Sequence, residues 1–304
     1  MGAVIETEVR FASGRGSCAG SLFRPDGPDS FLPLRPIVVL GHGLGAVRQM
    51  RLPAYARRFA RAGYLAMTFD YRHFGESSGE PRQLLSVRRQ QEDWQAAVRY
   101  ARSAPGADPR KIAVFGTSFG GGHVIALAAK DPSLAAVIAQ CPFTSGLASL
   151  LTVRPPGVVR VAASAAFDLL AAARRKPRSS VPLAGETGSA ALMNRPDAKD
   201  GYLGLVPEDF AFANAVSARS AAAIALWSPG RAASKVAPPV LFAVCERDSV
   251  APPVPTLRFA AQAPRATVKR YPFGHFEIYN GAAFEQAVED YVAFLHEHLP
   301  VPEL

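Results

Sequence analysis

The chain has 304 residues, of which 49% are hydrophobic and 19% charged, a balance that suits a single α/β domain carrying an insertion. Its formal net charge is +9, with 34 Lys and Arg against 25 Asp and Glu. The basic residues form scattered pairs such as Arg57-Arg58 and Arg88-Arg89 instead of one stripe interleaved with aromatics, so a nucleic-acid partner is not expected.

The cysteines and the N-terminal residues indicate in which cellular compartment the protein is expected to reside. Cys18, Cys141 and Cys245 are far apart and odd in number, which fits neither a disulfide framework nor a metal-ligand spacing. We expect buried, reduced thiols, no metal and no cofactor. Acidic residues stand where a signal peptide needs a basic start, and no run reaches the length of a membrane span. A cytoplasmic location is the resulting expectation, and membrane contact is not expected.

The first half of the chain alternates apolar runs with helical patterns. An antiparallel pair is predicted from 4–11 and 17–23, closed by turn residues. Further strands are predicted at 37–40, 64–69, 112–115 and 134–139, and helices at 53–62, 87–104 and 119–130. This alternation predicts a mostly parallel sheet with helices on both faces.

The composition changes near residue 144. From there to 235 no clear strand is predicted, 158–173 and 210–226 have helical patterns, and 182–207 is a loop-like stretch rich in Pro, Gly and Asp. Strands at 240–244 and 267–271, with helices at 255–263 and 282–299, complete a sheet of eight strands. We therefore predict a core domain from 1–143 and 236–304, with 144–235 inserted as a helical cap. The stretch 158–173 is interpreted as a lid helix, with a membrane-surface helix as the alternative.

The pentapeptide Gly116-Thr117-Ser118-Phe119-Gly120 carries the clearest chemical signal. It follows a predicted strand and precedes a predicted helix. Glycines on both sides of Ser118 remove the side chains that would clash in a sharp strand-to-helix turn, which leaves the serine strained and exposed. In a loop the same five residues would mean little, but this context predicts a nucleophile.

A serine hydroxyl needs an adjacent base, itself oriented by an acid. Asp248 follows the strand at 240–244, and His275 follows the strand at 267–271. Both are expected at the carboxyl edge of the parallel strands, where open α/β sheets place their ligands. The chain order Ser118, Asp248, His275 matches the order of one particular fold.

The Gly-x-Ser-x-Gly turn and the two later turns with Asp248 and His275, in this order, resemble the α/β-hydrolase superfamily. The likeness covers nearly the whole chain except 144–235, and it includes His42-Gly43-Leu44-Gly45 after the third strand. The resemblance implies Ser118 as nucleophile, His275 as general base and then acid, and Asp248 as the residue holding the imidazole. It also implies an oxyanion hole from the backbone N–H groups of Leu44 and Phe119. Within the superfamily, the His-Gly-x-Gly segment and 70–77 resemble the dienelactone-hydrolase and acyl-peptidase-like branch.

Other polar residues are weighed beside these. Glu246 is the alternative acid to Asp248. His42 is expected to brace the oxyanion loop, His73 is placed where it could touch substrate, and His123 is expected to be packed. His296 and His298 are expected in solvent on the last helix, and Asp70 and Arg72 are expected to be structural.

The function expected from this sequence is a serine hydrolase of carboxylic esters or thioesters that acts through an acyl-enzyme. An amidase or peptidase on the same triad is one alternative, and a non-catalytic ligand-binding protein of the same fold is another. The expected partner is a small-molecule ester, thioester or amide. The apolar residues of the predicted cap (Leu150, Leu151, Val159, Val161, Phe167 and Leu169) suggest an acyl or aromatic pocket, although a lid with its own core would show the same pattern. The apolar segment 291–304 could pack internally or form a homodimer.

Overall fold

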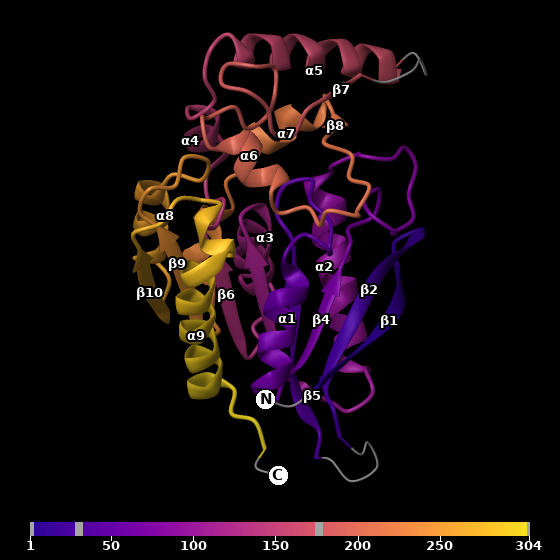
Figure 1. Ribbon diagram of the computed structural model, residues 1–304, viewed down its shortest axis with the longest axis vertical. Helices are drawn as coiled ribbons and strands as arrows, with labels where there is room; N and C mark the ends of the chain where they lie inside the picture. The colour runs from indigo at the N-terminus through magenta and orange to yellow at the C-terminus, as the bar shows by residue number, and fades with distance from the viewer. Residues whose placement is uncertain (1–2, 28–32, 174–178, 303–304) are drawn as a thin grey trace.

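A single mixed sheet organises the molecule. The structure, a computed structural model, describes residues 3–27, 33–173 and 179–302 (Figure 1). Within them, eight strands form one sheet in the order β1-β2-β4-β3-β5-β6-β9-β10. Their bounds are β1 Val4–Ser13, β2 Gly16–Pro25, β3 Arg35–Gly41, β4 Leu65–Phe69, β5 Ala107–Thr117, β6 Ala136–Gln140, β9 Val240–Cys245 and β10 Ala266–Tyr271. The β1–β2 and β2–β4 pairs are antiparallel and the others parallel, which confirms the predicted sheet.

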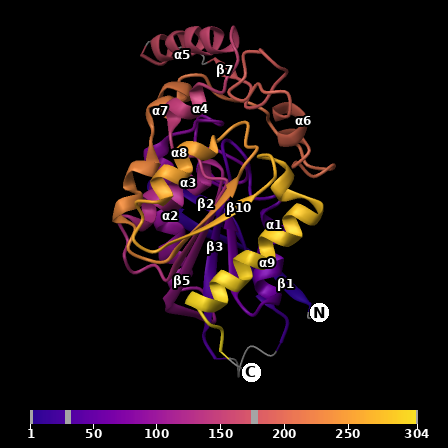
Figure 2. The ribbon, with the colours of Figure 1, turned by 90° about the vertical axis from the view of Figure 1, so that its left-hand side faces the viewer.

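The central strands read as continuous apolar runs because both of their faces are covered. Strands β3, β4, β6 and β9 are buried along their whole length. Helices α1 (Leu52–Arg61) and α9 (Gly281–His298) cover one face, while α2 (Val87–Arg102), α3 (Phe119–Ala128) and α8 (Pro253–Ala260) cover the other (Figure 2). The predicted layering of helices on both faces is confirmed.

The apolar C-terminal helix packs internally. Tyr291, Phe294 and Leu295 of α9 are buried in the main core. The Tyr291 hydroxyl donates to Gln140 Oε1 at 3.0 Å, which ties the helix to the end of β6. A homodimer stays an untested expectation.

The 144–235 segment stands over the carboxyl edge of the sheet (Figure 1). It contains α4 (Gly146–Leu150), α5 (Gly157–Ala173), α6 (Ala198–Leu203), α7 (Ser220–Leu226) and a two-stranded ribbon of β7 (Ser180–Val181) and β8 (Val216–Ser217). The chain enters it after β6 and returns through the 3₁₀ helix η2 (Pro229–Lys235) to β9. That this segment is a domain of its own stays a prediction.

Two expectations for this segment are wrong. The first half of the predicted helix 210–226 is not helical, because Asn214 hydrogen-bonds both the N–H and the carbonyl of Ala184 and Val216 pairs with Val181. Helix α6 lies inside the stretch expected to be a loop. Local apolar spacing predicted the first element, but these tertiary hydrogen bonds outweigh it.

Among the described residues, no helix combines the length and the apolar character that a bilayer crossing would need. The basic residues 174–176, which follow α5 in the sequence, lie outside the described residues.

Candidate active site

Ser118 occupies the sharp turn between β5 and α3. Its backbone has φ 55° and ψ −118°, a conformation that non-glycine residues rarely adopt. A Cβ on Gly116 would lie 2.1 Å from the carbonyl oxygen of Gly120, so the turn requires glycine at that position. The Ser118 N–H donates to Gln140 O at 2.9 Å and its carbonyl accepts from Phe143 N at 2.8 Å. These bonds hold the strained backbone in place.

Three residues that are distant in the sequence form one hydrogen-bonded chain at this turn. His275 Nε2 lies 3.0 Å from Ser118 Oγ, and His275 Nδ1 lies 2.7 Å from Asp248 Oδ2. Asp248 Oδ1 accepts the N–H groups of Val250 and Ala251 at 2.8 and 2.6 Å, which fixes the carboxylate plane. The structure thus brings together the three side chains that the sequence suggested.

The carboxylate makes the imidazole more basic. Burial lowers the pKa of His275, but the Asp248 charge, with Cys141 beside it, outweighs burial and raises that pKa well above its usual range. Burial raises the pKa of the Asp248 carboxyl, and its interaction with His275 acts in the opposite direction. The imidazole can take a proton from Ser118 only when it is neutral, so this arrangement favours a neutral to alkaline working range.

The other candidate residues have structural partners. Glu246 is exposed and pairs with Arg270 at 2.8 Å, so it does not orient His275. His73 is buried between Pro81 O (2.9 Å from Nδ1) and Arg89 Nη1 (2.7 Å from Nε2), and it does not line either of the cavities described below. The expectation that it could touch substrate therefore has no support in its position.

Two further histidines, His42 and His123, are buried and neutral, because burial disfavours the charged imidazole. Burial lowers the pKa of His42 to about 4 and that of His123 to about 3. His42 Nδ1 lies 3.1 Å from Gly43 O, within residues 42–45, called the oxyanion loop here. His123 is packed between Gln90 and Gln91. Both positions agree with their expected supporting roles.

Asp70 and Arg72 are structural as expected. Asp70 accepts from Arg48 N at 2.6 Å and from Arg48 Nη1 at 3.0 Å, which ties the residues after the oxyanion loop to the end of β4. Arg72 hydrogen-bonds through Nε to Asp93 and through Nη2 to Glu92.

The oxyanion loop lies directly against the nucleophile turn. A Cβ on Gly43 would be 3.1 Å from Ser118 Cβ. Leu44 lines both cavities beside Ser118. Phe119 is the first residue of α3, where N–H groups have no intrahelical acceptor and the helix dipole favours negative charge. The positions of Leu44 and Phe119 therefore suit the oxyanion role that the family resemblance implies.

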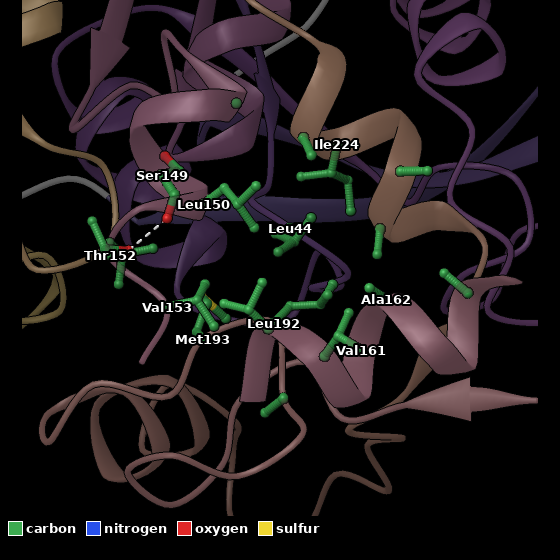
Figure 3. A pocket seen from close by; sticks show the side chains of 18 of the residues that line it. Leu44, Ser149, Leu150, Thr152, Val153, Val161, Ala162, Leu192, Met193 and Ile224 are labelled. Atoms are coloured by element: carbon green, nitrogen blue, oxygen red, sulfur yellow. Dashed lines mark hydrogen bonds between the residues drawn. The ribbon is translucent and has the colours of Figure 1, made fainter. Parts of the chain in front are cut away.

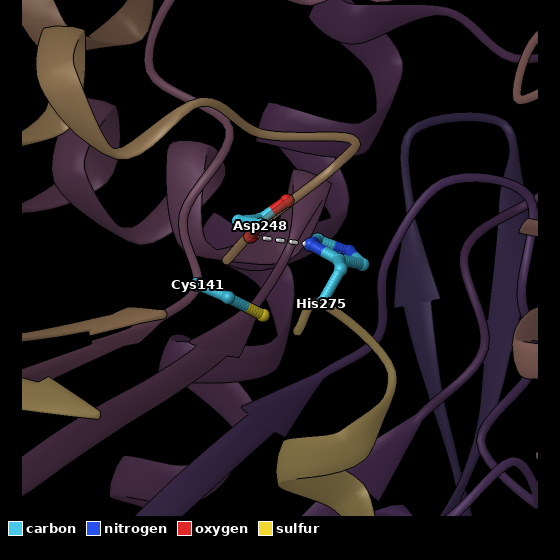
Figure 4. A group of neighbouring side chains, drawn as sticks. All are labelled: Cys141, Asp248 and His275. Atoms are coloured by element: carbon cyan, nitrogen blue, oxygen red, sulfur yellow. Dashed lines mark hydrogen bonds and ion pairs between the residues drawn. The ribbon is translucent and has the colours of Figure 1, made fainter. Parts of the chain in front are cut away.

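Cys141, at the end of β6, lies beside the Asp248–His275 pair (Figure 4). One potential ligand atom from each of the three residues lies within 4.8 Å of the other two, a spacing compatible with metal binding. Ligands of a tetrahedral zinc at about 2.0–2.1 Å stand roughly 3.3 Å apart. The 2.7 Å between His275 Nδ1 and Asp248 Oδ2 is instead the length of a hydrogen bond. As expected, Cys18, Cys141 and Cys245 are buried and free.

A cavity of about 370 Å³ opens beside Ser118 (Figure 3). Its described lining residues are apolar or glycine except for Ser118, Ser149, Thr152 and Arg195. Val161 and Ala162 of α5 face Ile224 of α7 across it (Figure 3). Seven alanines contribute to its walls: Ala162, Ala165, Ala166, Ala191, Ala221, Ala222 and Ala225. The walls are thus apolar and built largely from small side chains.

Of the apolar residues that suggested a pocket, Leu150, Val161 and Leu169 line this cavity. Leu151, Val159 and Phe167 do not line it, and they are more exposed than the three lining residues. On α5, the sequence pattern could not separate the lining residues from the others because both faces of the helix carry apolar side chains.

A second cavity of about 20 Å³ lies on the His275 side of Ser118. Leu44, Tyr202 and Phe276 also line it. Its volume is enough for about one water molecule. No sequence pattern singled out Tyr202, which reaches the site from α6.

Comparisons with known proteins bear on the family and the fold of the chain. The sequence model of the family described as serine aminopeptidase, S33, matches residues 33–283. The chain is similar to the quorum-quenching protein AidA of Acinetobacter baumannii, with 46% identity over 97% of this chain and 95% of that protein. A shorter similarity, 37% identity over 35% of this chain and 34% of the relative, is to the thiohydrolase aneE of Aspergillus aculeatus. The structure of DcsB in complex with its substrate analogue has a TM-score of 0.80 at 22% identity, covering 97% of this chain and 99% of the other, which shows a shared fold.

Proposed function

Because the chain belongs to the serine aminopeptidase S33 family of α/β hydrolases, we propose that it hydrolyses carboxylic esters or thioesters through an acyl-enzyme on Ser118. The observation that carries the proposal is the chain of hydrogen bonds from Ser118 Oγ through His275 to Asp248, 3.0 and 2.7 Å long. A neutral imidazole with its proton on Nδ1, facing Asp248, leaves Nε2 free to accept the serine proton.

The reaction proceeds in two steps. Ser118 Oγ attacks the carbonyl carbon while its proton passes to His275 Nε2, and the N–H groups of Leu44 and Phe119 receive the oxyanion. His275 then protonates the leaving alcohol or thiol as its bond to the carbonyl carbon breaks. Water in the smaller cavity attacks the acyl-enzyme with His275 as base, which releases the acid and restores the Ser118 hydroxyl.

The larger cavity holds the acyl group in this proposal. The cavity begins at Ser118, and its apolar walls continue from Phe119 and Leu44 to the space between α5 and α7. Such a surface binds a hydrocarbon chain by removing it from water, at about 0.8 kcal/mol per buried methylene. The name of the thiohydrolase relative supports including thioesters among the substrates.

The family description favours a second candidate, an aminopeptidase. An aminopeptidase must recognise a free ammonium group, and buried charges are normally paired. No Asp or Glu stands among the described residues that line either cavity, and Arg195 carries the same charge as the ammonium. We therefore place the ester and thioester reading first. Matched ester and amide substrates with the same acyl group would separate the two.

The similarity to a quorum-quenching protein favours a more specific substrate, a quorum-sensing signal, which the proposed chemistry requires to carry an ester or thioester bond. Incubating the protein with culture supernatant of a quorum-sensing bacterium and following a reporter strain tests this. Loss of the signal with the wild-type protein but not with Ser118→Ala would support it, and equal loss with both would contradict it.

Ser118→Ala tests the main proposal. We expect kcat for an activated ester to fall by about six orders of magnitude, because the nucleophile is lost. A fluorophosphonate probe should label the wild type and not the variant. Ser133→Ala is the matched control, because Ser133 is an exposed serine bonded to Asp131 and Arg102 far from the site. Retained turnover in Ser118→Ala would refute the mechanism, and absence of labelling in the wild type would favour a non-catalytic binding protein.

A further inference from the structure

Helix α6 of the 144–235 segment contacts the loops that carry the proposed oxyanion donor, base and acid. The first contact is a hydrogen bond of 2.7 Å from the Tyr202 hydroxyl to the carbonyl oxygen of Leu44. Tyr202 is buried, and its ring meets the ring of Phe276 edge to face at 6.4 Å. Burial raises the pKa of the Tyr202 phenol well above its usual range, so the hydroxyl keeps the proton that it donates.

The second contact is with the loop of the base. Gly201 lies so close to Phe276 that a Cβ on the glycine would stand 2.5 Å from Phe276 Cδ2. The Phe276 ring in turn meets the His275 imidazole edge to face, with centroids 4.9 Å apart. Helix α6 therefore supports the side chain that packs on the base.

The third contact is with the loop of the acid. Ser249, the residue after Asp248, donates its hydroxyl to the carboxylate of Asp197, 2.8 and 2.7 Å from the two oxygens. Asp197 is the N-cap residue of α6. One short helix thus touches residues 44, 249 and 276, each within the loop of one proposed catalytic group.

We propose that α6 is a brace for the catalytic loops and that Tyr202 is a positioning residue for the oxyanion loop. From the sheet side, the Tyr71 hydroxyl donates to His42 O at 3.3 Å, and from the other side Tyr202 holds Leu44 O. With a carbonyl fixed at either end, the turn holds the Leu44 N–H toward the place where the oxyanion forms. Donors fixed in advance stabilise a transition state most, because they need not reorganise during the reaction.

Tyr202→Phe tests this inference, which rests on the proposed hydrolase function. Removing one hydroxyl should lower kcat for a p-nitrophenyl ester roughly tenfold, the effect of one lost hydrogen bond, with KM unchanged. A trifluoromethyl ketone, which forms a tetrahedral adduct with Ser118, should bind about tenfold more weakly. The pH profile should not move, because the Asp248–His275 pair is untouched.

Tyr64→Phe is the matched control, because its hydroxyl also donates to a backbone carbonyl, that of Leu299 at 3.0 Å, far from the site. Ser249→Ala tests the contact between α6 and the loop of Asp248. Because Ser249 is half-exposed, this change avoids a buried substitution, and it should lower kcat several-fold. Wild-type kcat and ketone affinity in Tyr202→Phe would overturn the positioning role. A rise in KM alone would overturn it too, and would make Tyr202 a substrate contact. If Ser118→Ala also stayed active, the proposed hydrolase function would be wrong. If Ser118→Ala were inactive, only the positioning role of α6 and Tyr202 would be wrong.

Discussion

Asp248→Asn removes the negative charge from the proposed relay while keeping the shape of the side chain. Oδ1 accepts two backbone N–H groups, those of Val250 and Ala251, so an asparagine must leave its carbonyl oxygen there. Its NH₂ group then faces His275 Nδ1 at the position of Oδ2. An NH₂ donor forces the imidazole proton onto Nε2, which can no longer accept from Ser118. The equivalent change of tautomer in another triad lowers kcat about 10⁴-fold, and we expect a similar loss.

The same variant has a predicted effect on pH dependence. The Asp248 carboxylate raises the pKa of His275, so its removal lowers that pKa. Activity requires the neutral imidazole, and the rising limb of kcat/KM should therefore move to lower pH than in the wild type. Initial rates with an activated ester between about pH 5 and pH 10 would measure both the size of the loss and the position of the limb.

Glu246→Gln is the control, because Glu246 is the other carboxylate in this loop and pairs with Arg270 on the surface. This variant should keep the wild-type kcat, and the rising limb of its plot of kcat/KM against pH should not shift. The assignment of Asp248 as the acid would be wrong if Glu246→Gln lost activity while the kcat of Asp248→Asn stayed within tenfold of the wild-type value.

Two further substitutions test the 144–235 segment. Ala165→Phe places a bulky ring in the larger cavity. Each methylene of the substrate that the ring keeps out of the cavity should lower kcat/KM roughly fourfold, so kcat/KM for long acyl esters should fall about a hundredfold while that for acetyl esters is unchanged. Rates with p-nitrophenyl esters of graded acyl length would measure this difference. A uniform fall at all lengths would show that the chain does not bind there. Asp168→Ala removes a buried carboxylate that accepts from Ser179 N, Ser217 Oγ and Arg219 N, so urea denaturation should show about 1–3 kcal/mol less free energy of unfolding. An unchanged denaturation midpoint would contradict the anchoring role of this residue on α5.

The sheet and the three proposed catalytic side chains could be predicted because their signals are local. A run such as 112–115 is apolar because both of its faces are covered, and glycines flank Ser118 because the turn leaves no room for a Cβ. Parallel strands place their carboxyl ends at one edge, so Asp248 and His275 could be expected beside Ser118 before any distance was known.

The 144–235 segment could not be predicted in the same way, because tertiary contacts determine its elements. Helix α6 has six residues, fewer than an isolated helix needs, and it is fixed by partners such as Leu44 and Phe276 that are remote in the sequence. The stretch before α7 is not helical because Asn214 and Ser217 bond to other loops. No local pattern could have singled out Tyr202.

Because alanines line so much of the larger cavity, most single substitutions at these positions reduce its volume. Nearly every substitution of an alanine adds atoms, so single changes on α5 or α7 tend to narrow the space beside Ser118. At these alanine positions only glycine would remove atoms, so widening the space falls to the larger lining residues such as Leu150, Val161 and Leu169. Substitutions at the alanine positions should therefore restrict the range of acyl groups that the cavity accepts, whereas enlarging that range requires changes at the larger lining residues.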